Sequence, residues 1–197
     1  KAFFSIEIGT FGNAKVDTSF GVLSVCVNIM HSNDADVEAA LLAPDGTEVT
    51  LTYANGGTGN NFTNTCFTDI ADSSITIGTP PYTGDYRPME FIGNVNNGQF
   101  ANGTWKLMLR DLKPDVNSGM LSNWSITFGP HATPPYGLTS SNLPIVMINT
   151  YGASIPDDPK IESFMTIIDN PGGVRNYLSD PPAFTGHTGI EIRGSSS

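Results

Sequence analysis

The chain is poor in charged residues, and basic ones above all. Its 197 residues include 9 Lys and Arg against 19 Asp and Glu, giving a formal net charge of −10 with only 14% of residues charged. Nucleic acids and anionic membranes are bound through basic faces, so this balance argues against both as partners. The sequence also lacks an apolar run of transmembrane length, and no secretory n-region and h-region stand at Lys1. We therefore expect no membrane insertion.

Long amphipathic helices are missing as well. The chain instead holds 21 Gly and 14 Pro, with many Thr, Ser and Asn. Such a composition is typical of short strands joined by elaborate turns. It predicts an all-β fold.

The clearest strand signal lies in Asn102–Gly129. Apolar and polar residues alternate in Thr104–Arg110 and again in Leu121–Phe128, and an acidic, Gly-containing turn separates the two runs. A period of two with aromatic and β-branched residues predicts strands. We expect these two to form a hairpin, with Trp105 and Trp124 in the core. Strict alternation would place Leu121 on the face opposite Trp124.

Further strands are expected along the first part of the chain, at Lys1–Ile8, Gly21–Met30, Val37–Ala43, Glu48–Tyr53, Cys66–Asp69 and Ser73–Ile77. The third and fourth flank Pro44-Asp45-Gly46, a turn in which Pro sets φ and Gly supplies the left-handed residue, so they predict a hairpin. The polar stretch Ala54–Asn64 and the Pro-rich stretch Thr79–Pro88 are expected to be loops.

Residues 130–142 shift to Pro, Gly, Ser and Thr and form the best domain boundary in the chain. Residues 1–129 would form the main domain. Residues 143–197 would form a β-rich extension, with strands at Leu143–Thr150, Lys160–Ile168 and Gly189–Arg193. This extension has too little apolar surface to fold comfortably alone. We expect it to contact the first domain or to begin something larger.

The only two cysteines, Cys26 and Cys66, fall on separate predicted strands. A disulfide between them would contribute about 3–4 kcal/mol by restricting the unfolded chain. The alternative is a pair of buried free thiols in a reducing compartment. The secreted-looking composition favours the disulfide.

Three blocks of sequence resemble the P-domain found beside the catalytic domain of proprotein convertases and in many bacterial secreted proteins. They are Val25–Leu51, with its strand, histidine, acidic loop and Pro-Asp-Gly-Thr turn; Gly56–Asp69; and Tyr86–Pro88 together with Ala101–Asp111 and Ser118–Phe128. The resemblance implies a jelly-roll-like β-sandwich. It also implies a protein that is secreted or displayed on a bacterial cell surface.

The C-terminal part resembles a second family. Leu143–Thr150, Ile155–Asn170 and Gly189–Ser197 are similar to the N-terminal part of CotH-type, spore-coat kinase-like proteins. In that family the Arg-Gly-Ser segment leads into a Pro-Lys-Lys segment and the kinase-like body. Neither stands within these 197 residues, so the resemblance implies only the leading edge of such a module.

Calcium is the most promising site chemistry in the sequence. Ca²⁺ takes six to eight oxygens from carboxylates, amides and carbonyls gathered by loops. Three loops could provide them, and their candidate ligands are Asp34, Asp36, Asn60, Asp69, Asp111, Asp115 and Asn117. The resemblance matches Asp36 and Asp69 to acidic positions of the family, and it matches Asn60 to a position where related sequences often carry Asp. The alternative is that these side chains cap turns.

The sequence offers no catalytic constellation. His31, His131 and His187 lie in very different settings, and no nucleophile motif accompanies them. We expect His31 to hold a backbone group at a strand end. The chain is thus predicted to be a non-catalytic, calcium-stabilised β-sandwich that supports a larger secreted protein through its other domains or neighbouring subunits. The alternatives are an accessory part of a CotH kinase-like enzyme and an adhesion or filament subunit.

Overall fold

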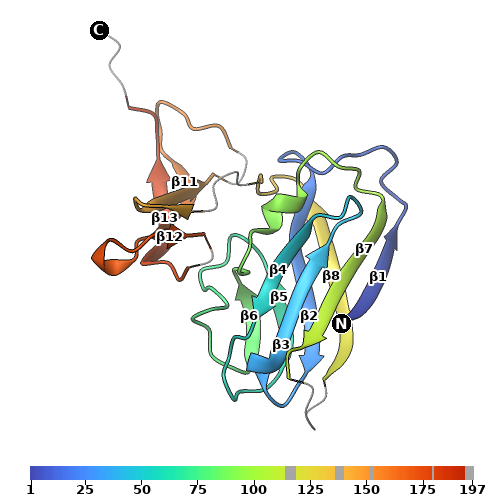
Figure 1. Cartoon of the computed structure of the whole chain (residues 1–197). Coiled ribbons are helices and arrows are strands. Elements are labelled where there is room, and N and C mark those ends of the chain that lie inside the picture. Colours follow the sequence, from blue (N-terminus) through green and yellow to red (C-terminus); the bar gives the residue numbers. More distant parts are fainter. Residues whose placement is uncertain (114–118, 136–139, 151–152, 179, 194–197) are drawn as a thin grey trace.

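The protein is all-β, as predicted. The structure, a computed structural model, describes residues 1–113, 119–135, 140–150, 153–178 and 180–193 (Figure 1). Its strands are β1 Ala2–Ile8, β2 Gly21–Met30, β3 Val37–Leu42, β4 Glu48–Tyr53, β5 Phe62–Phe67, β6 Tyr82–Tyr86, β7 Gly103–Asp111, β8 Met120–Gly129, β9 Ser140–Ser141, β10 Ile145–Asn149, β11 Ile161–Ile168, β12 Asn176–Tyr177 and β13 Phe184–Ile190. Three 3₁₀ turns complete the elements, η1 Asp34–Asp36, η2 Ile92–Val95 and η3 Pro171–Gly173.

Two four-stranded sheets form a sandwich. One has the order β1-β7-β3-β4 and the other the order β6-β5-β2-β8. Their inward side chains meet in one apolar core that includes Val25, Val27, Leu41, Leu51 and Trp105. Because neighbouring residues of a strand point to opposite faces, the alternation seen in the sequence supplies this core. The jelly-roll-like sandwich is therefore confirmed.

The predicted hairpin of Thr104–Arg110 with Leu121–Phe128 is wrong. β7 pairs with β1 and β3, whereas β8 pairs with β2 in the opposite sheet. The ring of Trp105 on β7 meets that of Phe128 on β8 edge-on, with centroids 5.4 Å apart. This contact spans the interior between the sheets. Alternation fixes the inward face of a strand but does not identify its neighbour.

A register shift also changes the predicted face of Leu121. Asn28 on β2 is paired with Asn123, but the next residue, Ile29, is paired with Leu121. The extra residue on β8 is the mark of a β-bulge, which lets two successive positions occupy one place in the ladder. Leu121 consequently packs against the core beside Trp124, contrary to the prediction from strict alternation.

The region before β7 departs from the sequence prediction at three places. β5 begins at Phe62, inside the stretch predicted as a loop, because Phe62 is an apolar anchor of the core. Ser73–Ile77 is not a strand and contributes a single bridge from Ser74 to Arg87. Tyr82–Tyr86, predicted as loop, is β6 and runs parallel to β5 at the edge of the sheet. An edge strand tolerates flanking prolines, because only one of its sides must form ladder bonds.

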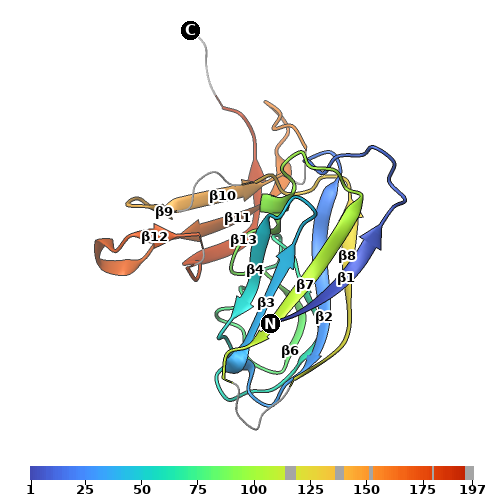
Figure 2. The ribbon, with the colours of Figure 1, turned by 45° about the vertical axis from the view of Figure 1, so that its right-hand side comes forward.

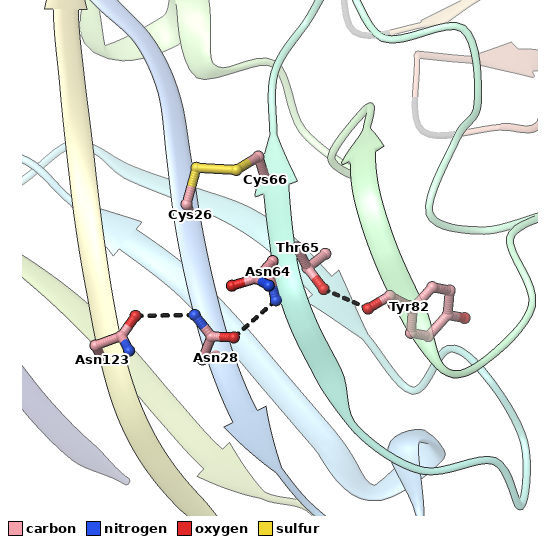
Figure 3. Close-up of a disulfide and its surroundings, with 7 residues drawn as sticks. All are labelled: Cys26, Asn28, Asn64, Thr65, Cys66, Tyr82 and Asn123. Carbon is pink, nitrogen blue, oxygen red and sulfur yellow. Dashed lines mark hydrogen bonds between the residues drawn. A yellow bond between two sulfur atoms is a disulfide. The ribbon is translucent and has the colours of Figure 1, made fainter.

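The disulfide between Cys26 and Cys66 is present, with an S–S distance of 2.06 Å. The two residues are directly paired on β2 and β5. Side-chain bonds cross the sheet nearby, as Figure 3 shows: Asn28 donates to Asn123 at 2.9 Å, and its own amide oxygen accepts from the Asn64 backbone N–H at 2.7 Å. The hydroxyl of Thr65 donates to the carbonyl of Tyr82 on β6 at 2.7 Å. Covalent and polar links thus join all four strands of this sheet.

A second unit follows the sandwich. β10, β11 and β13 form an antiparallel sheet, and β9 pairs with β12 (Figure 2). The last strand occupies Phe184–Ile190 rather than the predicted Gly189–Arg193. The sheet contacts the sandwich, since Arg87 donates to the hydroxyl of Thr166 at 3.3 Å and Thr185 donates to the carbonyl of Asp72 at 3.1 Å. Among the described residues, no helix is long and apolar enough to cross a membrane.

Candidate cation site

Two buried carboxylates lie at one end of the sandwich, on the short turn η1 between β2 and β3. Asp34 and Asp36 are both 0% exposed. The loop that precedes β5 covers them: the backbone N–H of Asp34 donates to the carbonyl of Gly59 at 2.8 Å, and that of Ala35 donates to the carbonyl of Gly57 at 3.1 Å. Burial of charge is costly unless a partner compensates it, so the partners of each carboxylate decide its role.

Asp36 is compensated by the protein itself. Its carboxylate accepts from the side-chain amide of Asn33 at 2.6 Å, and the ammonium of Lys113 lies 3.1 Å from its other oxygen. Its backbone carbonyl also accepts from Leu112 at 2.7 Å. Asp36 therefore ties η1 to the segment that follows β7.

Asp34 has no such compensation. Neither of its carboxylate oxygens has a hydrogen-bond partner among the described residues. Burial raises the pKa of this carboxyl to about 6. The nearby backbone N–H of Asn61, which donates to the carbonyl of His31 at 3.2 Å, and the charge of His31 offset that rise only in part. Burial and the nearby Asp34 charge also raise the pKa of Tyr82 to about 12, and the Tyr82 hydroxyl is buried without a partner in the described structure. A cation beside Asp34 would compensate its charge.

Only glycine fits at position 56 in the loop over Asp34. Its φ is +93°, and a Cβ there would stand 2.9 Å from atoms of Asp34, Pro80 and Tyr82. The absence of a side chain lets the loop backbone approach the carboxylate closely. The carbonyl of Gly56 accepts from the backbone N–H of Gly59 at 3.0 Å, so the loop folds tightly over η1.

The oxygen donors near Asp34 fit a hard cation. Besides the carboxylate of Asp34, the side-chain oxygen of Asn33 on the same turn is buried and has no partner within the described part of the chain. Oxygen-only donor sets of this kind suit Ca²⁺ rather than a transition metal. In those same residues no group of three His, Cys, Asp or Glu side chains converges. Among the described side chains, a cation here would thus depend on one carboxylate and one amide.

His31 and Asp111 lie next to this site, and both side chains accept hydrogen bonds from backbone N–H groups. The Nδ1 atom of His31 accepts from the backbone N–H of Asn33 at 3.1 Å, which confirms its predicted role at the strand end. Its Nε2 atom is 3.6 Å from a carboxylate oxygen of Asp111. The other oxygen of Asp111 accepts from the N–H of Lys113 at 3.0 Å. Asp111 therefore caps the turn after β7.

The remaining candidate residues are not gathered around Asp34. Asn60 is exposed on the covering loop. Asp69 lies beyond the far end of β5, where its two oxygens accept from the backbone N–H groups of Ile92 and Gly93, both at 2.8 Å. Burial raises the pKa of Asp69 to about 6 against the effect of these bonds. Asp115 and Asn117 lie outside the described residues.

Sequence reasoning missed Asn33, Lys113 and Tyr82 as members of this region. Asn33 and Lys113 bind Asp36 directly, and Tyr82 approaches Asp34 from β6. The acidic composition of the loop pointed to Asp34 and Asp36, and Asn33 lies in the same loop. No local pattern relates Lys113 or Tyr82 to it, because each arrives through pairing of distant strands.

The sandwich is similar to domains of known proteins. A family model described as the proprotein convertase P-domain matches residues 21–128, more than half of the chain. The chain belongs to the proprotein convertase P-domain family. The match spans β2 to β8 and includes the whole candidate cation site. P-domains are β-sandwich modules of larger proteins, and they are non-catalytic accessory modules of proteases.

Individual relatives are longer than this P-domain chain. It is 30% identical to leupeptin-inactivating enzyme 1 of Streptomyces exfoliatus over 120 residues, which are 61% of the chain but 20% of that protein. Two similar solved structures are the Aeromonas sobria serine protease in complex with the chaperone ORF2 (20% identity, 68% and 24% of the two chains covered, TM-score 0.29) and the serine protease alone (17%, 67% and 24%, TM-score 0.27). The chain thus spans about a fifth of the curated relative's length.

Proposed function

We propose that this P-domain is a non-catalytic accessory module that works outside the cell or at its surface. It supports and positions other parts of a larger secreted protein, and bound Ca²⁺ rigidifies its loops. The observation that carries the positioning role is the contact between the sandwich and the polypeptide that follows it. Residues 1–129 form the supporting domain, residues 130–142 the linker and residues 143–197 the segment that is held.

The contact is built on a buried cation of the sandwich. Arg87 is only 5% exposed, and its guanidinium reaches Thr166 in the middle strand of the C-terminal sheet. Burial lowers the pKa of Arg87, whereas the charge of Asp72 acts to raise it. The carbonyl of that same Asp72 accepts from Thr185. Two neighbouring strands of the second sheet are therefore fixed to one spot on the sandwich.

The calcium role is supported by the buried carboxylate of Asp34 and the buried side-chain oxygen of Asn33, which have no hydrogen-bond partner among the described residues. An extracellular setting is supported by the disulfide, since disulfides persist in oxidising compartments. The acidic, lysine-poor composition agrees with the same setting.

A second candidate is an accessory part of a CotH kinase-like enzyme. The stretches that resemble that family form a sheet of their own after the P-domain match ends at residue 128, which is what a separate module would do. A third, adhesion or filament assembly, draws on the exposed sheet edges. The sequence of the gene beyond Ser197 separates these candidates, because a Pro-Lys-Lys segment followed by kinase-like acids favours the second and adhesin repeats favour the third.

Thermal melting tests the leading proposal. The chain should melt at a higher temperature in millimolar Ca²⁺ than in chelator, because a ligand that binds only the folded state stabilises it by mass action. Equal melting temperatures would remove the structural role of calcium. Magnesium at the same concentration is the matched control for ionic strength.

A further inference from the structure

The side chain of Asn96, directly after η2, is buried and bonded to backbone groups. It is 2% exposed. Its amide oxygen accepts from the N–H of Val22 at 2.8 Å, and its amide nitrogen donates to the carbonyl of Val22 at 3.1 Å and to that of Thr133 at 2.9 Å. Both N–H groups of the amide and its oxygen are thus occupied. Asn96 therefore joins η2 to the start of β2 and to the first residues of the linker.

Those first residues, 131–134, which we call the strap, lie directly on η2. Ala132 is buried within the strap. A Cβ added at Gly93 would stand 2.3 Å from the carbonyl oxygen of Pro134 and 2.9 Å from that of Thr133. Both are backbone atoms, so no side chain could turn away to make room. The close approach of the two backbones therefore requires glycine at position 93.

The turn η2 is itself held from β5. Asp69, which follows that strand, accepts from the N–H groups of Ile92 and Gly93, both at 2.8 Å. These N–H groups open the turn and have no acceptor within it. Burial raises the pKa of Asp69 to about 6, and the side chain of Thr133 is among the groups that act to lower it. Thr133 thus lies against both Asp69 and Asn96.

Two prolines, Pro134 and Pro135, follow Thr133. The proline ring fixes φ near about −65°, so the chain has no freedom in φ at either position. The family match ends at residue 128, but contacts with the sandwich continue to Pro134. The sandwich, rather than a flexible tether, therefore sets the path along which the chain leaves it.

One stretch of sequence holds both the strap and the C-terminal sheet. Residues 69–96 join β5 to β7 and include β6. They contact the strap through Asp69, Gly93 and Asn96, and the sheet through Asp72 and Arg87. Domains of one chain move relative to each other unless their contact is extensive. A fixed exit would remove part of the freedom that the contacts with the sheet leave.

We propose that the strap fixes the direction in which the polypeptide leaves the P-domain, and that Asn96 positions the strap. The C-terminal sheet then takes one orientation on the sandwich, because its chain arrives along a defined path. The proposal rests on the positioning function proposed above and names the residues through which that function acts.

Distances between pairs of spin labels test the proposal. Both pairs share a label at Ser5→Cys on β1. The second label is at Pro135→Cys, next to the strap, or at Glu162→Cys on β11. All three positions are exposed, and labelling without reductant keeps the Cys26–Cys66 bond closed. The first pair reports the path of the strap, and the second reports the orientation of the C-terminal sheet.

Both distance distributions should be narrow in the otherwise unchanged chain. Asn96→Ala removes the bond to Thr133, and Gly93→Ala places a methyl group against the strap backbone, so either change should broaden both distributions about twofold or more. The matched control is Asn97→Ala, which removes the bonds of the next, exposed side chain to Asp45 and Thr47 and should leave both widths unchanged. The two test variants act independently, so the one that keeps a folded sandwich, shown by cooperative thermal unfolding, decides the test.

Two results would overturn the proposal alone. One is a pair of distributions that stay narrow in N96A and G93A. The other is a broader distribution to Pro135 beside an unchanged one to Glu162, because the strap would then move without the sheet. A broad distribution to Glu162 already in the otherwise unchanged chain would overturn the proposal together with the positioning function. None of these labels or substitutions touches the loops around Asp34, so the calcium proposal can fail separately.

Discussion

The guanidinium of Arg87 donates to the hydroxyl of Thr166, 79 positions further along the chain, at 3.3 Å. Arg87 comes from the sandwich, directly after β6, and Thr166 from the middle strand of the C-terminal sheet. One Nη atom of Arg87 has no partner among the described residues. The bond to Thr166 therefore satisfies one N–H of this buried guanidinium and helps to fix the second sheet on the sandwich.

Replacing Arg87 by Met should release the C-terminal sheet while leaving the sandwich folded. Hydrogen bonds to charged groups contribute about 1.5–3 kcal/mol, and the variant should lose about that much stability at the contact. Hydrogen exchange measures this directly: amides of β11 and β13 should exchange faster, whereas those of β2 and β7 should not. Lys15→Met, which removes an exposed cation beside Phe100, serves as the control. Unchanged exchange in β11 would show that Arg87 does not hold the sheet.

Asp34→Asn should abolish stabilisation by calcium. With free Ca²⁺ at about 100 times its Kd, mass action contributes about 2.7 kcal/mol, or about 5–10 °C in Tm for a chain of this size. The Asn variant should show the same Tm with calcium and with chelator. Asp85→Asn removes an exposed carboxylate from β6 and should keep the full calcium effect. A full effect in D34N would place any bound ion elsewhere.

Stability in chelator should fall as pH rises from about 4 to about 6. The folded-state pKa of Asp34 and that of Asp69 are both raised from 3.8 to about 6. A carboxyl with a raised pKa binds more protons in the folded state than in the unfolded state, so its protonation stabilises the fold between the two values. Urea unfolding at several pH values should show the decline, and Asp34→Asn should remove the Asp34 share. A rise in stability across this window in the wild type, without any flattening in the variant, would contradict the burial argument.

Gly56→Ala should destabilise the protein by more than Gly57→Ala. Both glycines have positive φ, +93° and +54°, but only at Gly56 would the new Cβ meet other atoms, at 2.9 Å. Backbone strain costs about 1 kcal/mol for either change, and the clash adds about 1–3 kcal/mol at Gly56. Chemical denaturation of the two variants checks the difference. Equal losses would mean that the loop shifts freely away from Asp34.

Several features of the fold could be read from the sequence because they are local. Alternation in Gly21–Met30 correctly places Val25, Val27 and Ile29 in the core, and the Pro-Asp-Gly turn correctly joins β3 to β4. The strands with which β7 and β8 pair could not be predicted in this way. Both strands have strong alternation, but their neighbours come from distant parts of the chain.

The candidate site shows the same division. The acidic loop marks Asp34 and Asp36 without indicating which of them lacks a partner. Lys113 compensates Asp36 from beyond β7, and Tyr82 approaches Asp34 from an edge strand whose prolines suggested a loop. Asp69 matched the family's acidic position, yet its oxygens are occupied by the N–H groups of Ile92 and Gly93. These contacts join residues that are far apart in the sequence, so the local spacing of residues does not predict them.

The pairing of β1 with β7 has a consequence for the order in which the chain can fold during its synthesis. Ala2 lies opposite Leu109, and Ile8 lies opposite Gly103. At about 5–20 residues per second, the ribosome adds the partner strand roughly 5–20 s after the first strand. Throughout that interval Phe4 and Ile8, which later pack against the core, have no sheet to join. Until β7 has been made, β1 therefore has no partner strand, and its apolar side chains are open to contacts with other chains.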